Sequence, residues 1–288
     1  MAVIPEAIIE NYRQKTFRSE PGNRIHTIEE AIEFVNQRGF VFFWPIQGLV
    51  LPSLWVAAAG NRPVADQHDD PGHITWGWKD QLLGSKVWYY ARVLHRKNTI
   101  ISLKILPCFY ALSPNYGDPD HDYLEQYYSG TLTTEAKQIY EALLREGPLD
   151  TLSLRKAARL SSPESTSRFN RALETLQTEF KVLPVGIAQA GAWRYAFIYD
   201  VVHRHFPNLI EQSRPIPEKQ ARFEILKCYF DSVGAASFVQ IQRLFGWRKD
   251  ELQRTLKELT DKGFISPDHL LEKRNEPLFV LASLIGTL

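Results

Sequence analysis

The sequence is poor in cysteine and contains no long apolar run. Its two cysteines, Cys108 and Cys228, stand far apart, and neither belongs to a Cys-x-x-Cys pair. This spacing excludes a disulfide framework and a zinc finger built on cysteines. No apolar stretch reaches the roughly 18 residues that a membrane-spanning helix needs. The chain also does not open on a basic segment followed by an apolar one, so the sequence predicts neither a membrane span nor a secretory signal peptide.

An excess of charge of either sign is missing as well. Lysine and arginine together number 34, aspartate and glutamate number 33, and the formal net charge is +1. This balance excludes a polybasic coat for nucleic acid but is compatible with a local basic face. Glycine-rich phosphate loops and the Gly-x-Ser-x-Gly motif are also absent, which removes two common signals of enzymatic chemistry.

The 288 residues suit two or three small domains, and the second half of the chain contains an internal repeat. Residues 133–185 and 220–268 follow one helical pattern. In each copy an amphipathic helix ends at a glycine that we expect to be left-handed, and a second helix begins at a capping residue. The glycines are Gly147 and Gly234, and the capping residues are Asp150 and Ser237.

A third helix and a β-hairpin complete each copy. The third helices carry apolar residues at helical spacing within 169–176 and 252–259. The extended stretches that follow are Val182–Ile187 with Trp193–Tyr199 in the first copy, and Phe264–Ile265 with Leu278–Leu281 in the second. Three helices followed by a hairpin are typical of the winged helix-turn-helix. A generic helical bundle with an added hairpin is the competing interpretation.

The first 130 residues are rich in aromatic side chains. A helix over Thr27–Arg38 begins with a capping box, ends at a glycine and is followed by the apolar segment Gly39–Pro45. Further elements are expected at Leu54–Ala59 (helix), Lys86–Leu106 (extended, with a turn at 96–98) and Asp118–Tyr128 (helix). Five of the seven tryptophans lie here, namely Trp44, Trp55, Trp76, Trp78 and Trp88. These rings indicate either a large aromatic core or a pocket that stacks on an unpaired base.

Together these patterns predict an α+β fold that is mainly helical and consists of three tandem winged helix-turn-helix domains. The expected domains are residues 1–130, which would be winged-helix-like with an aromatic-rich pocket, residues 131–205 and residues 206–288.

Three stretches of the chain form a pattern known from one protein family. The first is a helix followed by Gly39–Trp44, the second is Trp88–Tyr90 running to Ser102 and Pro107, and the third is the pair of downstream helical units. In these stretches the chain resembles the AlkZ/YcaQ-type winged-helix DNA glycosylases. The resemblance implies a monomer that binds double-stranded DNA without a small-molecule cofactor. Because the sequence shows no signal peptide or membrane span, we expect a cytoplasmic protein that is associated with the nucleoid when it binds DNA.

The segment that corresponds to the family's catalytic motif departs from it. The resemblance implies Gln-x-Gln or Gln-x-Asp at this point, whereas the aligned positions hold Phe42 and Trp44, and Gln47 lies several residues further on. An aromatic ring can neither orient a water molecule nor accept its proton. We therefore expect a diverged member that recognises DNA without robust base excision, and whether it is an enzyme stays open.

A polar loop supplies the best replacement acids, which are Asp66, Asp69 and Asp70. The same loop contains His68 and His73, so three interpretations stand side by side. It is a divalent-metal site, a polar loop that lines the aromatic pocket, or an ordinary solvated loop. Because no ligand spacing here matches a known metal motif, we predict no metal.

Basic residues on the third helices are the candidate contacts to DNA. In the second copy these are Arg248, Lys249, Arg254 and Lys257, and in the first copy Arg168 and Arg171. Positive charge near a helix start suits phosphate contact because the unbonded amides there also attract anions.

Three classes of function fit this sequence. One is a DNA-repair-type protein that recognises or acts on a damaged base. The second is a non-catalytic winged-helix transcription regulator, and the third is a protein-interaction scaffold. A continuous basic channel would favour the first, a basic patch on one unit the second, and no patch the third.

Overall fold

A computed structural model describes residues 2–67, 69–191, 194–272 and 276–286. The chain forms an α+β fold in which helices surround three small sheets. His68, Trp193 and part of the charged loop at 272–276 lie outside the described residues. Within the described part, no helix is both long and apolar enough to cross a membrane.

The described residues contain the same series of six elements three times. The series is helix, strand, helix, helix, strand and strand. We call its occurrences the first, second and third repeats. The first consists of α2 (Ile28–Arg38), β2 (Phe40–Phe42), α3 (Leu54–Ala59), α4 (Ile74–Leu82), β3 (Trp88–Arg92) and β4 (Asn98–Ser102). The second consists of α7 (Thr134–Glu146), β5 (Leu149–Asp150), α8 (Thr151–Ala157), α9 (Thr166–Thr178), β6 (Val182–Ala188) and β7 (Ala196–Val201). The third consists of α12 (Glu218–Val233), β8 (Ala235–Ser237), α13 (Phe238–Phe245), α14 (Lys249–Asp261), β9 (Ile265–Leu271) and β10 (Leu278–Leu281).

The three repeats also share their sheet topology. In each, the last strand lies between the first and the second, giving the orders β2-β4-β3, β5-β7-β6 and β9-β10-β8. All these pairings are antiparallel. The segments 169–176 and 252–259 lie in α9 and α14, the third helix of their repeats, as expected from the sequence.

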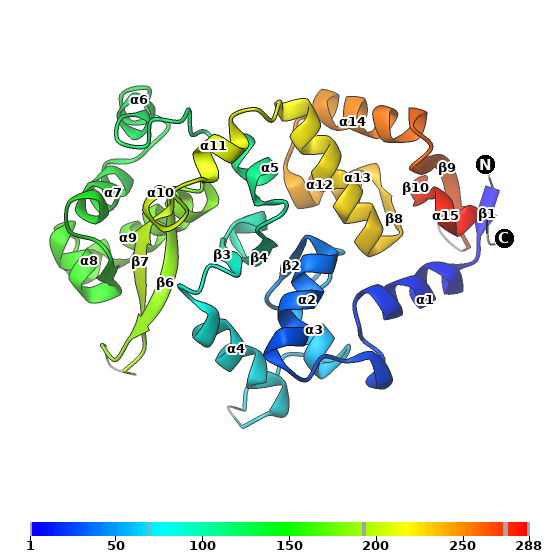
Figure 1. Ribbon diagram of the computed structural model, residues 1–288, viewed down its shortest axis with the longest axis horizontal. Helices are drawn as coiled ribbons and strands as arrows, with labels where there is room; N and C mark the ends of the chain where they lie inside the picture. Colours follow the sequence, from blue (N-terminus) through cyan, green and yellow to red (C-terminus); the bar gives the residue numbers. More distant parts are fainter. Residues whose placement is uncertain (1, 68, 192–193, 273–275, 287–288) are drawn as a thin grey trace.

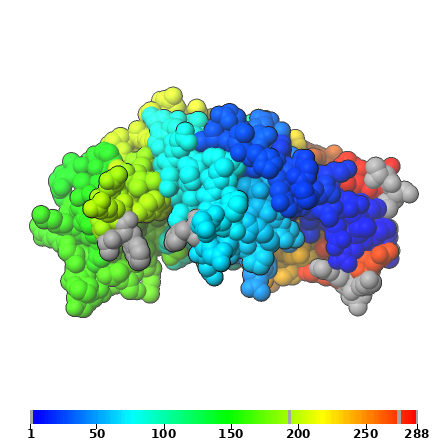
Figure 2. Space-filling view, turned by 90° about the horizontal axis from the view of Figure 1, so that it is seen from below, coloured from blue at the N-terminus to red at the C-terminus, as the bar shows by residue number. Residues whose placement is uncertain are grey.

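Shorter elements connect or flank the repeats. They are α1 (Glu6–Thr16), α5 (Leu106–Ala111), α6 (Asp122–Tyr128), α10 (Val202–His205), α11 (Leu209–Ser213), α15 (Ala282–Ile285), strand β1 (Ala2–Ile4), and the 3-10 turns η1 (Pro21–Asn23), η2 (Pro71–His73), η3 (Leu94–Arg96) and η4 (Pro163–Ser165). The second repeat occupies one end of the molecule, the third lies towards the other, and the first lies between them (Figure 1). Seen from below, the molecule is elongated and gently arched (Figure 2).

Local sequence signals explain several helix ends. Thr27 and Glu30 form the expected capping box of α2, and Asp150 caps α8 by accepting hydrogen bonds from two backbone amides. Gly234 ends α12 with a φ of 72°, which glycine adopts without steric cost. Gly147 ends α7 for a different reason. Its φ is −65°, but a Cβ there would lie 2.7 Å from the Leu143 carbonyl oxygen.

The N-terminal segment belongs structurally with the C-terminal one. Strand β1 pairs in parallel with β9. From α1, Tyr12 donates a hydrogen bond to the Asp231 carbonyl at 2.9 Å, and Arg13 donates to the carbonyls of Val233 and Ala235. Residues 2–16 therefore pack on the third repeat and extend its sheet.

The largest apolar core is shared among all three repeats. It joins Phe42 of β2 and Tyr89 of β3 to Phe180 after α9 and to Phe230 of α12. The second repeat also has a core of its own, which includes Phe169 and Leu176 of α9. The shared core holds the repeats together around the tip of the β3–β4 hairpin.

Candidate nucleic-acid interface

The segment in which the sequence-based resemblance expects a catalytic motif begins in the packed strand β2 and continues into the turn that follows it. Phe42 is fully buried and pairs with Thr99 of β4. Trp44 is half-buried, and its ring stacks on that of Trp76 with centroids 5.9 Å apart. Gln47 is exposed in a turn. Neither aromatic side chain offers a group that could hold a water molecule for attack on a sugar.

Asp70 has a structural role in the polar loop. Its carboxylate accepts two hydrogen bonds from Arg62, at 3.0 and 2.5 Å, and one from the Gly72 amide at 2.7 Å. The bonds from Arg62 and Gly72 lower the pKa of Asp70. Asp66 and Asp69 are exposed. Among the residues that the structure describes, no three His, Cys, Asp or Glu side chains gather closely enough to hold a metal ion.

The aromatic residues around this loop pack against one another. Trp55 is fully buried, and the His73 ring packs between Trp55 and Trp76 at centroid distances of 5.2 and 5.7 Å. Gly72 is required here because a Cβ would approach the Trp55 ring to 2.7 Å. These rings therefore form part of the core.

On α4, the third helix of the first repeat, the one lysine side chain is turned inward. Lys79 Nζ lies within 6 Å of five aromatic rings, of which Phe197 of β7 is the nearest at 4.7 Å. It also pairs with Asp80 at 2.5 Å and donates to the Tyr195 hydroxyl at 2.7 Å. Burial lowers the pKa of Lys79. This cluster joins the first repeat to the second, so α4 does not offer Lys79 to a ligand.

The tip of the β3–β4 hairpin, residues 93–97, touches the other two repeats, and we call it the junction turn. Its central residues His95 and Arg96 have φ values of 53° and 56°. Left-handed backbone at two consecutive non-glycine residues is strained, and such strain is concentrated at functional sites. The His95 ring hydrogen-bonds the Arg243 carbonyl. On the other side, the backbone carbonyl of Arg92, at the end of β3, accepts a hydrogen bond from the Thr178 hydroxyl at 3.0 Å.

A cleft runs between the junction turn and α9. It has a volume of about 580 Å³, and we call it the arginine cleft. Arg92 and Arg96 approach from the first repeat and Arg171 from α9. The remaining lining residues are Pro163, Glu164, Thr166, Ser167, Asn170 and Glu174.

The arginines of this cleft are only loosely engaged. Arg92 and Arg96 share Glu174, at nitrogen–oxygen distances of 3.8 and 3.9 Å. Arg171 has no ion-pair partner among the described residues. Arg96 remains 54% exposed at its side chain. The cleft thus presents guanidinium groups, hydroxyls and an amide to an anionic ligand.

The basic residues of α14 are arranged differently. Arg254 pairs with Asp250 at 2.5 Å, and Lys257 pairs with Asp261 at 2.6 Å. Arg248 pairs with Glu251 at 2.8 Å. Lys249 is exposed at the start of the helix. In the second repeat, Arg168 reaches Glu135 at 3.2 Å.

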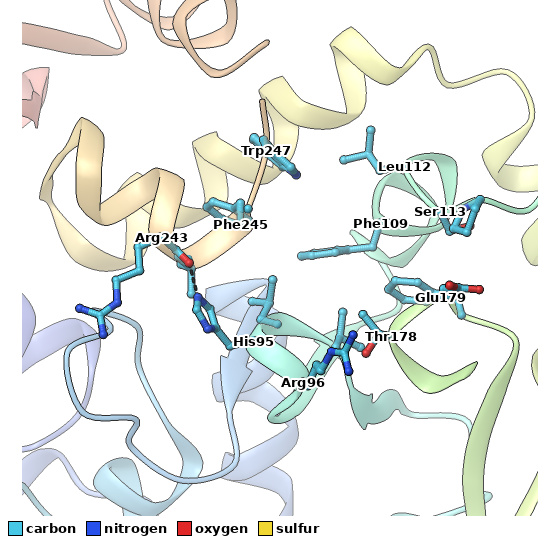
Figure 3. A pocket seen from close by; sticks show the side chains of 16 residues that line it. His95, Arg96, Phe109, Leu112, Ser113, Thr178, Glu179, Arg243, Phe245 and Trp247 are labelled. Atoms are coloured by element: carbon cyan, nitrogen blue, oxygen red, sulfur yellow. Dashed lines mark hydrogen bonds between the residues drawn. The ribbon is translucent and has the colours of Figure 1, made fainter. Parts of the chain in front are cut away.

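A second cavity, which we call the junction pocket, adjoins the arginine cleft. It has a volume of about 470 Å³, and Arg96 lines both cavities. Figure 3 shows Phe245, the last residue of α13, and Trp247, from the turn before α14, facing Phe109 of α5 and Leu112 directly after it across an open space. Glu179 and Phe180 come from the end of α9. All three repeats therefore contribute to this pocket.

Glu179, which lines the junction pocket, interacts with a buried lysine outside it. Burial raises the pKa of Glu179, and its Oε2 has no hydrogen-bond partner within the described part of the chain. Behind it, Lys181 donates to Asn115, and burial lowers the pKa of this lysine to about 8. Residues Arg92, His95, Arg96 and Glu179 are absent from the sequence-based candidates, because none of them lies within an expected recognition helix.

One comparison with known proteins identifies a family. Residues 25–246 match a family described as AlkZ related. Among solved structures, the chain is similar to the DNA glycosylase AlkZ of Streptomyces sahachiroi, with a TM-score of 0.61 and 12% identity over 99% of this chain and 72% of that one. At this identity the structural likeness concerns the fold alone. No curated protein matches the sequence.

Proposed function

The chain belongs to the AlkZ-related family, and on this premise we propose that it is a monomeric DNA-binding protein that recognises damaged double-stranded DNA. In this proposal the three repeats are three winged-helix units that lie within residues 1–130, 131–205 and 206–288, and residues 2–16 pack on the last unit. Their shared order of helices and strands and their shared sheet topology support this assignment.

The arginine cleft is the observation that carries the proposal. Three arginines from two repeats converge on it, whereas two glutamates, Glu164 and Glu174, oppose them. A DNA backbone presents regularly spaced phosphates, and each one that is neutralised releases counterions. Arginine is suited to this contact because its planar group can donate two hydrogen bonds to one phosphate.

The exposed face of α14 is a second contact surface in this proposal. Arg248, Lys249, Arg254 and Lys257 remain the candidates there, although three of them already have acidic partners. DNA would have to displace these partners, so the expected gain per residue is smaller than in the arginine cleft.

Base excision is not part of the proposal. The chain has Phe42 and Trp44 where the catalytic amides or acid would stand, and the carboxylate of Asp70 is already engaged by Arg62. Recognition needs phosphate contacts and a pocket, and neither depends on those residues.

Fluorescence anisotropy with labelled duplexes at several salt concentrations tests this function. We expect binding whose logarithm falls linearly with the logarithm of salt concentration, with little preference among undamaged sequences. Strong preference for one sequence would instead identify a transcription regulator. The absence of binding even at low salt would leave the protein-interaction scaffold.

A further inference from the structure

The junction pocket has the construction of a binding site for a flat, partly apolar group. Phe109 and Phe180 form an apolar floor, and both are at least nine-tenths buried. Trp247 stacks on Phe245 with centroids 4.6 Å apart, which makes a stiff aromatic wall. A cavity of about 470 Å³ lies within the size range of roughly 300–1,000 Å³ that is usual for small-ligand sites.

Polar groups at the pocket wall would suit the edge of a heterocycle. Glu179 also lines the pocket, but its unpartnered Oε2 is enclosed by protein atoms and is out of reach of a ligand. His95 and Thr178 line the same cavity, and each already hydrogen-bonds a backbone carbonyl. The second ring nitrogen of His95 and the lone pairs of the Thr178 hydroxyl are still able to bond a ligand. The lining thus combines stacking surface with hydrogen-bonding groups.

The position of the pocket identifies the kind of molecule that would fill it. Arg96 stands between the junction pocket and the arginine cleft and lines both. A ligand that spans the two must be aromatic at one end and anionic at the other. A nucleotide within a DNA strand has this form, because its base and its phosphate are joined through one sugar.

We propose that the junction pocket receives a single unpaired base of DNA whose flanking phosphates lie in the arginine cleft. This inference rests on the proposed DNA-binding function. It adds that the protein selects DNA in which one base has already left the helical stack. The free energy of unstacking and unpairing is smallest for such a base. The left-handed junction turn places His95 and Arg96 among the residues that line the pocket.

The test compares two duplexes of the same sequence, one fully paired and one with a single unpaired base. We expect the protein to prefer the second by about tenfold, which corresponds to stacking of one base on aromatic side chains. The variant Leu112→Trp narrows the pocket from the residue that follows α5, where Leu112 is half-buried, and should abolish this preference without weakening binding to the paired duplex.

Two further measurements make the test specific. The control variant Val3→Trp adds the same indole at an exposed position on β1 and should keep the preference. When the unpaired base is 5-iodouracil, photocrosslinks should map to Phe109, Phe245 or Trp247.

The outcomes distinguish the proposed base pocket from the proposed DNA-binding function. Binding of both duplexes with equal affinity, or a preference that survives Leu112→Trp, would overturn the base pocket and leave DNA binding intact. Crosslinks confined to other segments would do the same. Failure to bind either duplex would overturn the proposed function itself.

Discussion

Helices α9 and α14 hold the same place in their repeats and both carry arginines, yet they present them in different ways. On α14 the basic side chains pair along their own helix, as in Arg254 with Asp250 at 2.5 Å. On α9, Arg171 faces a cleft whose other arginines come from the first repeat. Pairs at i and i+4 on an exposed helix contribute only tenths of a kcal/mol to stability, about 0.3–0.5.

The difference shows that an equivalent position does not ensure an equivalent surface. A helix with alternating charges has little net electrostatic attraction for a polyanion, because each cation has an anion beside it. Convergence from two elements instead gathers cations that have no close partner. Arg92, at the end of β3, and Arg96, in the junction turn, make this possible beside α9.

The largest expected effect comes from removing the charges of the arginine cleft. Arg92→Ala, Arg96→Ala and Arg171→Ala together should weaken duplex binding by about a hundredfold, because each arginine removed costs about 1 kcal/mol of binding free energy. The magnitude of the salt slope should fall by about 1 for each phosphate that is no longer neutralised. Anisotropy titrations over a range of salt concentrations measure both quantities.

The matched control removes the same number of charges from α14. Arg248→Ala, Arg254→Ala and Lys257→Ala together should weaken binding by only about threefold, because these side chains already have acidic partners. Circular dichroism should show folded protein in both variants, since the altered side chains are exposed. If the two triple variants lose equal affinity, the distinction between the helices is wrong.

A smaller effect of opposite sign is expected when the cleft loses an acid. Glu174 is shared by Arg92 and Arg96 at 3.8 and 3.9 Å. Glu174→Gln keeps the shape of the side chain and releases both arginines, so duplex binding should strengthen about fivefold. Unchanged or weaker binding would show that the glutamate positions the arginines rather than competing with DNA for them.

Much of the second half of the fold could be predicted from its sequence. Asp150 and Ser237 do cap the second helices of their repeats, and the apolar spacing located α9 and α14 correctly. Such signals are local, since they depend on residues within one or two turns. The expected left-handed Gly147 was wrong, because close packing on the Leu143 carbonyl, not backbone handedness, requires glycine there.

The features of the fold and the site that could not be predicted depend on residues that are distant in the sequence. Pairing of β1 with β9 brings Ile4 to Leu271, and no local pattern indicates it. The first repeat is hard to see in the sequence because long segments separate β2 from α3 and α3 from α4. The arginine cleft joins Arg96 to Arg171 across two repeats, so helix-based reasoning could find only Arg171.

An effect smaller still is expected from the acids of α14. Asp250→Asn and Asp261→Asn release Arg254 and Lys257 from their partners. If α14 is only a secondary contact, the same anisotropy assay should show affinity rising by less than about twofold. A rise as large as that of Glu174→Gln would mean that α14 lies against the DNA backbone and that its pairing regulates the contact.

The smallest expected effect is on base excision, for which we expect no product. Loss of a damaged base requires a group that activates water and stabilises the cationic sugar. Phe42 is buried in β2, and Trp44 offers only a ring. A ring can attract a cation weakly but cannot take a proton. Incubation with duplexes that carry alkylated or crosslinked bases should therefore give a bound complex without excised base in the wild type, and no excised base in the cleft variants either.

Variants of the acids in the polar loop test most directly whether base excision is absent. Asp66 and Asp69 are free to approach DNA, whereas Asp70 is bound to Arg62. Multiple turnover that disappears in Asp66→Asn or Asp69→Asn would identify a replacement acid outside the usual motif. Turnover that is lost in Asp70→Asn together with thermal stability would instead reflect the broken Arg62 pair. If neither the wild type nor any aspartate variant excises a base while the arginine cleft still determines DNA affinity, this chain recognises DNA without excising bases.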